Sequence, residues 1–381
     1  MGQKCKEYIF FFSENKESLS KQVRTAILEL EYLAKWLIEF GNSQHGTYEG
    51  IGFSEKLRIP SLVSTDYLPG RKIRQYLTGN KLPKCKILLT SATISDTNSN
   101  IGEDSFTDIR VELGIKQNEI YQRKKFFPSD FGSMSFVLPD KNIPNPVLKN
   151  ETGNIDKVSF DPQWLKYISS MILEAGKNRR GVLVLTHSFS ETEAIRSQII
   201  ETKNIYFHLH DTQIKDCIDA LKEQSGILIS PGLSEGFSER KPEGAQLFGD
   251  LVITRIPFNP FSEFHQDVFV EQYLKNVIGS NMNMAKRSFY AKSQGYALRK
   301  FRQQLGRGLR KYDDSITIWV GDPRFPHPSA INNYSLNEYN SIFRRVIPTR
   351  FYNEYQNSLV FGEDGRFNKA ILEENMENIV L

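Results

Sequence analysis

The chain has 381 residues, with 49 lysines and arginines against 45 aspartates and glutamates and a formal net charge of +4 at pH 7. This length predicts about two to three domains, at roughly 100–200 residues each. Because the overall charge is ordinary, an interaction with nucleic acid must rest on local charge. Cys5, Cys85 and Cys217 form no Cys-x-x-Cys pair, so we expect a reducing compartment and neither a disulfide framework nor a metal site.

Nothing in the sequence indicates a membrane protein. No run approaches the roughly 18 consecutive apolar residues that a membrane span needs. No secretory signal is visible, and Lys6 stands where an N-myristoylation site requires serine or threonine. We therefore expect a cytoplasmic protein with no membrane partner.

In residues 1–85, apolar side chains recur at three- and four-residue spacing, which predicts an amphipathic helix capped by Ser18 or Ser20. The stripe consists of Val23, Ile27, Leu30, Ala34 and Leu37. Such a stripe is a core face or a docking face. Two alternatives stay open: the stripe binds another chain or a second copy, or it is buried within this chain.

After residue 130, apolar segments alternate with amphipathic ones, which predicts a parallel sheet covered by helices on both faces. The expected strands and apolar segments are 135–139, 181–186, 205–207, 226–230 and 250–258. The expected helices are 161–176, 190–202 and 212–224. His208 and His210 follow one of these strands, and without a third ligand nearby we expect them to have surface or packing roles rather than to bind a metal.

Polar residues follow several of these strands. Ser91 and Thr93 end an apolar strand that begins at Lys86, and Thr186 and Ser188 end the strand 181–186. Open α/β sheets bind ligands at the carboxyl ends of their strands, where a hydroxyl can donate to a nucleic-acid phosphate. For Ser188 the alternative is that it caps the next helix.

The segment 297–310 is the most informative in the chain. Gln303 and Arg307 are four residues apart and Arg307 and Arg310 are three apart, so on a helix all three would project from one face. Guanidinium groups bind phosphate oxygens in a forked geometry, and an arginine aimed at a γ-phosphoryl group neutralises charge in the transition state. The alternative is an ordinary solvated basic helix.

The wider stretch 284–311 contains nine lysines and arginines and no acidic residue. Aromatic residues interleave with them: Phe289, Tyr290, Tyr296 and Phe301. Basic and aromatic side chains together suit a groove that follows a single strand and stacks its bases. Packing in the core explains at least half of these aromatic residues.

The order of the motifs along the chain is specific. They are Ser-Ala-Thr at 91–93, Thr-His-Ser at 186–188, Glu-Gly at 235–236, Ile-Pro-Phe at 256–258, Gln-x-x-Gly-Arg-x-x-Arg at 303–310 and Asp-Pro-Arg at 322–324. This order resembles motifs III to VI of the DinG- and XPD-type superfamily 2 DNA helicases. The resemblance implies a RecA-like second helicase domain at 96–345. It also implies a mainly helical remnant of the first motor domain and arch insertion at 1–95, and a C-terminal extension at 346–381.

The resemblance also implies roles for individual residues. Arg307 and Arg310 would be catalytic and reach the γ-phosphate of ATP. The nucleotide would be contacted by Gln303, Gly306, Glu235 and Gly236, and single-stranded DNA by Ser91, Thr93, Thr186 and Ser188. Family members usually carry an acidic residue at the position of Ser238. This departure argues against efficient coupling of ATP hydrolysis to movement.

The sequence contains neither a Gly-x-x-x-x-Gly-Lys-Ser/Thr phosphate loop nor Asp-Glu-Ala-His. The resemblance therefore implies that ATP and Mg²⁺ are shared with a first motor domain, supplied by a companion chain or a missing N-terminal half. We expect this chain alone to be inactive. The family's iron–sulfur cysteines belong to that half, so no cluster is expected here. The alternative is a non-hydrolysing nucleic-acid-binding or regulatory subunit, from a degenerate or split helicase of a defence or mobile-element system.

Overall fold

The computed structural model describes part of the chain, which divides into two compact units. The described residues are 47–54, 59–66, 96–97, 104–105, 113, 115, 132–148, 159–233, 239–258, 263–276, 279–328, 347 and 351–369. The first unit comprises 1–86, 110–116 and 261–289, and the second comprises 87–109, 117–260 and 290–381. The polar networks and the loop described below belong to the second unit, whereas residues 284–289 of the basic stretch belong to the first.

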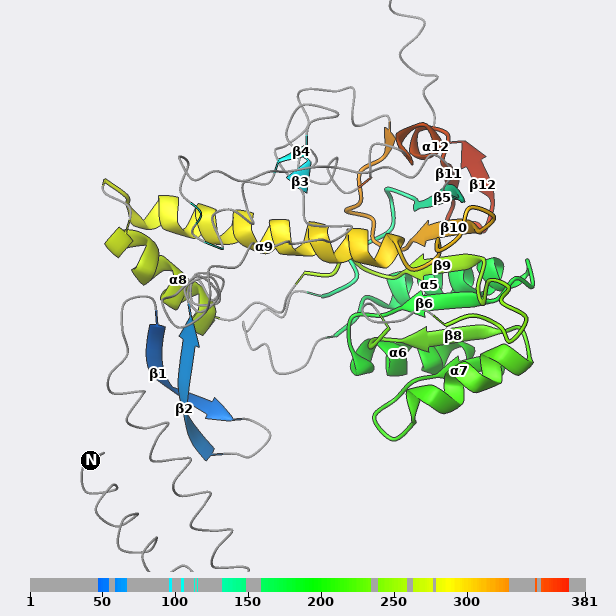
Figure 1. The fold of residues 1–381 in the computed structure, drawn as a ribbon, viewed down its shortest axis with the longest axis horizontal. Helices are drawn as coiled ribbons and strands as arrows, with labels where there is room; N and C mark the ends of the chain where they lie inside the picture. The colour runs from blue at the N-terminus through cyan, green and yellow to red at the C-terminus, as the bar shows by residue number, and fades with distance from the viewer. Residues whose placement is uncertain are drawn as a thin grey trace, which may run out of the picture. The chain divides into compact units, whose positions relative to one another are not determined.

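An eight-stranded sheet forms the second unit, in the order β12-β11-β5-β10-β9-β6-β8-β7 (Figure 1). All neighbouring strands are parallel except β11 and β12, which are antiparallel. The strands are β5 (Ser133–Pro139), β6 (Val182–Leu185), β7 (Ile205–Phe207), β8 (Ile227–Ser230), β9 (Asp250–Ile253), β10 (Ser315–Val320), β11 (Leu359–Phe361) and β12 (Phe367–Lys369). The expected parallel α/β sheet is thereby confirmed.

Helices cover both faces of this sheet. They are α5 (Pro162–Gly176), α6 (Phe189–Ile199), α7 (Ile214–Glu223), the second part of α9 (Met282–Leu305) and α12 (Tyr352–Gln356). Side chains of α5 and α6 share one apolar core with Val182 and Val184. Side chains of α7, α9 and α12 share the other core with Leu183 and Leu185. Alternate residues of β6 thus face opposite layers, which explains why its sequence is apolar throughout.

Local sequence sets the helix starts. The Asp161 side chain accepts hydrogen bonds from the N–H groups of Gln163 at 2.9 Å and Trp164 at 3.1 Å, and Pro162 occupies the first helical position of α5. Ser188 caps α6 by accepting from the N–H of Glu191 at 3.2 Å. The expected helices at 161–176, 190–202 and 212–224 are found within a few residues of these bounds.

The C-terminal segment is part of the eight-stranded sheet. The predicted extension at 346–381 supplies α12, β11 and β12, so it completes one edge of the sheet. The Tyr167 hydroxyl of α5 donates to the Phe361 carbonyl at 2.7 Å and fastens this edge to the helical layer.

Two further strand pairs and a helix were not expected. β1 (Thr47–Ser54) and β2 (Ile59–Asp66) form an antiparallel pair, as do β3 (Asp96–Thr97) and β4 (Asp104–Ser105). Helix α8 (Glu263–Asn276) belongs to the first unit, where Phe269 packs against Tyr273 and Phe289. The predicted apolar stripe at 23–37 lies outside the described residues. Among the helices that are described, none is long and apolar enough to cross a membrane.

Candidate functional site

Gln303, Arg307 and Arg310 do not share a helix face, so that expectation is wrong. Gln303 lies in the last turn of α9, which ends at Leu305, and both arginines follow it in a loop before β10. Gly308 lies in this loop at a close approach, where a Cβ atom would lie 1.6 Å from Cδ1 of Ile316. This position therefore requires glycine, which also disfavours continuation of the helix. We call residues 306–314 the arginine loop.

A buried carboxylate anchors the arginine loop. Oδ2 of Asp314 accepts hydrogen bonds from the backbone N–H groups of Arg310 at 2.6 Å and Lys311 at 2.7 Å, and from Nη2 of Arg240 at 2.6 Å. Burial works against ionisation of Asp314, but these hydrogen bonds outweigh it and lower its pKa. The Asp314 carboxylate therefore holds the end of the arginine loop by accepting three hydrogen bonds.

Gln246 provides a second anchor. Its side-chain amide donates to the Gly308 carbonyl at 2.8 Å, and its side-chain carbonyl accepts from the Ser315 N–H at 3.1 Å. Gln246 and Arg240 both lie in the segment that follows residues 234–238, which contain the Glu235–Gly236 motif. That segment thus contacts the arginine loop directly. Sequence reasoning missed both anchors, because each pairs residues more than sixty positions apart.

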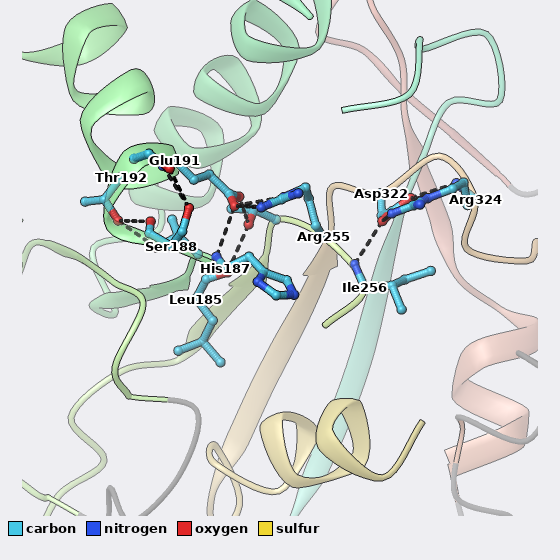
Figure 2. A network of polar contacts seen from close by, with 12 residues as sticks. Leu185, His187, Ser188, Glu191, Thr192, Arg255, Ile256, Asp322 and Arg324 are labelled. Carbon is cyan, nitrogen blue, oxygen red and sulfur yellow. Dashed lines mark hydrogen bonds and ion pairs between the residues drawn. The ribbon is translucent and has the colours of Figure 1, made fainter. Parts of the chain in front are cut away.

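A second polar network lies at the carboxyl ends of β6 and β9, centred on the fully buried Glu191 (Figure 2). Its carboxylate accepts from the His187 N–H at 3.0 Å, from Nε and Nη2 of Arg255 at 2.8 and 2.6 Å, and from the Thr254 hydroxyl. Arg255 also lies over the ring of Phe160, 5.3 Å from its centroid. Glu191 therefore joins the ends of two neighbouring strands.

Asp322 makes a similar connection one strand further on (Figure 2). Its Oδ2 accepts from the Ile256 N–H at 2.9 Å and from Nη2 of Arg324 at 2.6 Å. Its Oδ1 accepts from Nε of Arg324 at 2.8 Å. The motif residues 256–258 and 322–324, which are far apart in sequence, are thereby held together at the ends of β9 and β10.

The predicted DNA-contacting hydroxyls of Thr186 and Ser188 lie at the carboxyl end of β6. The Thr186 hydroxyl is buried and lies 2.7 Å from the hydroxyl of Thr192, and Ser188 caps α6. The capping alternative for Ser188 is therefore what the structure shows. Burial, followed by the positive charge of Arg255, lowers the pKa of His187, so this ring is neutral near pH 7. Contact between these residues and nucleic acid stays a prediction.

The structure does not bring all the predicted site residues together. Thr186 and Ser188 follow the carboxyl end of β6, whereas Arg307 and Arg310 precede the amino end of β10. Because β6, β9 and β10 are parallel neighbours, these groups lie at opposite edges of the sheet. The other predicted residues lie outside the described part of the chain: Ser91, Thr93, Glu235, Gly236 and Ser238.

The two histidines after β7 contact other side chains, as expected. Nδ1 of His208 lies 2.8 Å from the Ser230 hydroxyl, and the rings of His208 and His210 both pack on Phe189. Within the described residues, no group of three or more histidine, cysteine, aspartate or glutamate side chains is placed to hold a metal ion.

Comparisons with known proteins agree with the fold and the motif order. Residues 172–338 match the family described as the helicase C-terminal domain. The ATP-dependent DNA helicase XPD of Sulfolobus acidocaldarius is 27% identical over 169 residues, which are 43% of this chain and 29% of that protein. A solved XPD helicase structure has a TM-score of 0.53 at 18% identity, covering 84% of this chain and 52% of the other. This chain thus spans less than a third of the curated relative.

A parallel sheet with helices on both faces, carrying these motifs in this order, defines a helicase C-terminal domain with a RecA-like fold. The similarity of this region to the XPD helicase supports a helicase C-terminal region of the XPD and DinG type. The resemblance drawn from the motifs is therefore confirmed for this region.

Proposed function

We propose that this chain supplies the C-terminal motor domain of an ATP-dependent DNA helicase. It would couple ATP hydrolysis to translocation on single-stranded DNA when completed by a half that carries the phosphate loop and Asp-Glu-Ala-His. The observation that carries this proposal is the anchored arginine loop, because an arginine finger acts only when it is held in a defined place.

In this proposal Arg307 and Arg310 reach the γ-phosphate, and Gln303 and Gly306 border the nucleotide. The anchors Asp314 and Gln246 fit such a role, since they fix the loop backbone and leave the arginine side chains outside these particular bonds. Magnesium would be held by the completing half, and its chemistry is to neutralise charge on the phosphates. Here the chain's own residues supply positive charge and orientation.

Single-stranded DNA would cross the carboxyl edge of the sheet, near Thr186 and Ser188, and the basic stretch 284–311 would add phosphate contacts. The two polar networks support this role because they hold the strand ends of β6, β9 and β10 in a fixed arrangement. Binding would be sequence-independent, since phosphate contacts carry no base information. The second candidate is a non-hydrolysing nucleic-acid-binding or regulatory subunit, which Ser238 at a usually acidic position favours.

ATP hydrolysis separates these candidates. We expect no turnover by the pure chain and DNA-stimulated turnover when a companion carrying the phosphate loop is added. In that complex Arg307→Ala should lower turnover by about 10³–10⁵-fold, the usual contribution of an arginine finger. Arg366→Ala is the matched control, because Arg366 is exposed in the β11–β12 turn and pairs only loosely with Asp364 at 3.7 Å.

Two results would contradict the proposal. DNA-stimulated turnover by the pure chain that Arg307→Ala abolishes would show that no companion is needed. Near-normal turnover by the Arg307→Ala complex would remove this arginine from the nucleotide site. A complex that binds DNA without hydrolysing ATP would favour the regulatory subunit.

A further inference from the structure

A cluster of three rings at the carboxyl edge of the sheet has no part in the functions described so far. Phe189 is the first residue of α6, and His208 and His210 follow β7. The centroids of Phe189 and His210 are 4.0 Å apart with the rings tilted by 35°, and His208 meets Phe189 edge-on at 5.3 Å. We call these three residues the ring cluster.

The ring cluster is fixed in place yet open to solvent. Ser230, at the end of β8, holds His208 through its hydroxyl at 2.8 Å and also accepts from the Gly232 N–H at 3.1 Å. Phe189 and His208 are half-buried, whereas His210 is exposed. One face of the His210 ring therefore rests on Phe189, and its remaining surface meets water.

The polar groups of Glu191 in the first turn of α6 are already bonded, so they do not account for this surface. The Glu191 N–H is bonded to Ser188, and the Glu191 carboxylate is paired with Arg255 and the His187 N–H. The Glu191 N–H is therefore not available to a ligand. What the ring cluster offers beside it is a flat aromatic surface.

We propose that the exposed face of His210 is a stacking platform for a base of single-stranded nucleic acid. The base would continue the stack that Phe189 and His210 begin. Aromatic side chains stack with every base because each base has a π-face, so such a platform needs no particular sequence. Because His210 already packs on Phe189, and Ser230 holds the neighbouring His208, the platform binds without the entropy cost of ordering loose rings. This inference rests on the proposed single-strand binding and names one of its contacts.

Fluorescence anisotropy with two labelled strands of about 16 nucleotides tests the proposal. One strand is oligothymidylate, and the other has the same backbone with abasic sites throughout. His210→Ala should weaken binding of oligothymidylate by roughly 5- to 140-fold, which is the range that stacking of one base covers. Its affinity for the abasic strand should stay unchanged, because that strand has no base to stack.

Further variants separate stacking from charge and from folding. His210→Phe should retain the affinity for oligothymidylate, and His210→Lys should not, since lysine supplies positive charge without a ring. Phe189→Leu should also weaken binding, because it removes the ring beneath His210. Ile200→Ala is the control, as Ile200 is a 55% exposed apolar residue at the other end of α6, outside the ring cluster, the arginine loop and the basic stretch.

Salt titrations complete the test. The slope of log affinity against log salt should be the same for His210→Ala and the unaltered chain. This slope depends on the number of phosphate contacts, which release counterions, and does not depend on base stacking. Equal loss on both strands, a changed slope, or no loss at all would overturn the inference while leaving single-strand binding intact. Failure of the unaltered chain to bind either strand at low salt would overturn the proposed DNA binding as well.

Discussion

Acidification should destabilise the second unit through one buried histidine. His327 is buried, and its Nε2 lies 2.6 Å from the Pro139 carbonyl, so the neutral ring donates this bond. Burial, with a smaller contribution from the positive charge of Lys141, lowers the pKa of His327 from 6.5 to about 4. In the unfolded chain the ring has its ordinary pKa, so it takes up a proton there at a higher pH than in the folded state.

The sign and size of the effect follow from this difference. Above pH 6.5 the ring is neutral in both states and has no pH-dependent effect. As the pH falls from 6.5 towards 4 only the unfolded state is protonated, and the free energy of unfolding falls by about 1.4 kcal/mol per unit. The total loss is about 3 kcal/mol, reached near the folded-state pKa.

Urea denaturation at several pH values measures this loss. The pKa values of His187 and His208 are also lowered by burial, so the comparison must be made against a variant. His327→Gln keeps a donor for Pro139 and should have a shallower pH dependence than the unaltered chain, by about 3 kcal/mol between pH 7 and 4. Parallel curves for the two proteins would refute the reasoning.

Three further predictions concern the networks and the charge of the chain. Gly308→Ala should destabilise by about 1–3 kcal/mol in the same urea assay, because its Cβ would overlap the buried Ile316 side chain; a change below that range would show that the loop moves freely. Glu191→Ala should cost about 3–5 kcal/mol, since it leaves the largely buried Arg255 without its carboxylate, and Glu191→Gln should cost less. Binding to single-stranded DNA should weaken with salt, with a log–log slope of about −0.7 per phosphate contact, and salt-independent binding would argue against the basic stretch.

The strands and helices of the sheet domain could be predicted because each one follows from the pattern of residues within its own short segment. The short strand β6 is apolar throughout and β8 is apolar except for its last residue, and the cap at Asp161 involves only residues two and three positions further on. The order of motifs was equally readable from the sequence. The match of residues 172–338 to the helicase C-terminal domain confirms the family resemblance that this order indicated.

The geometry of the candidate site could not be predicted, since it depends on contacts between distant segments. Helical spacing placed Arg307 on α9, but the helix ends at Leu305, and Gly308 packs closely against Ile316 in the loop that follows. Likewise, no spacing rule connects Arg240 to Asp314 across 74 positions. Glu191 was overlooked because a glutamate near a helix start usually faces solvent, whereas here it is buried under Arg255.

The position of β5 in the sheet has a consequence for biosynthesis. Both of its neighbours come late in the chain, since Ser133 pairs with Ser315 in β10, and Val137 pairs with Leu359 in β11. A ribosome adds about 5–20 residues per second, so β5 waits on the order of ten seconds or more before either partner has been made. During that interval both edges of an apolar strand are unpaired, which is the condition under which strands associate with other chains. β5 is thus the segment of the nascent domain that most needs shielding by a chaperone.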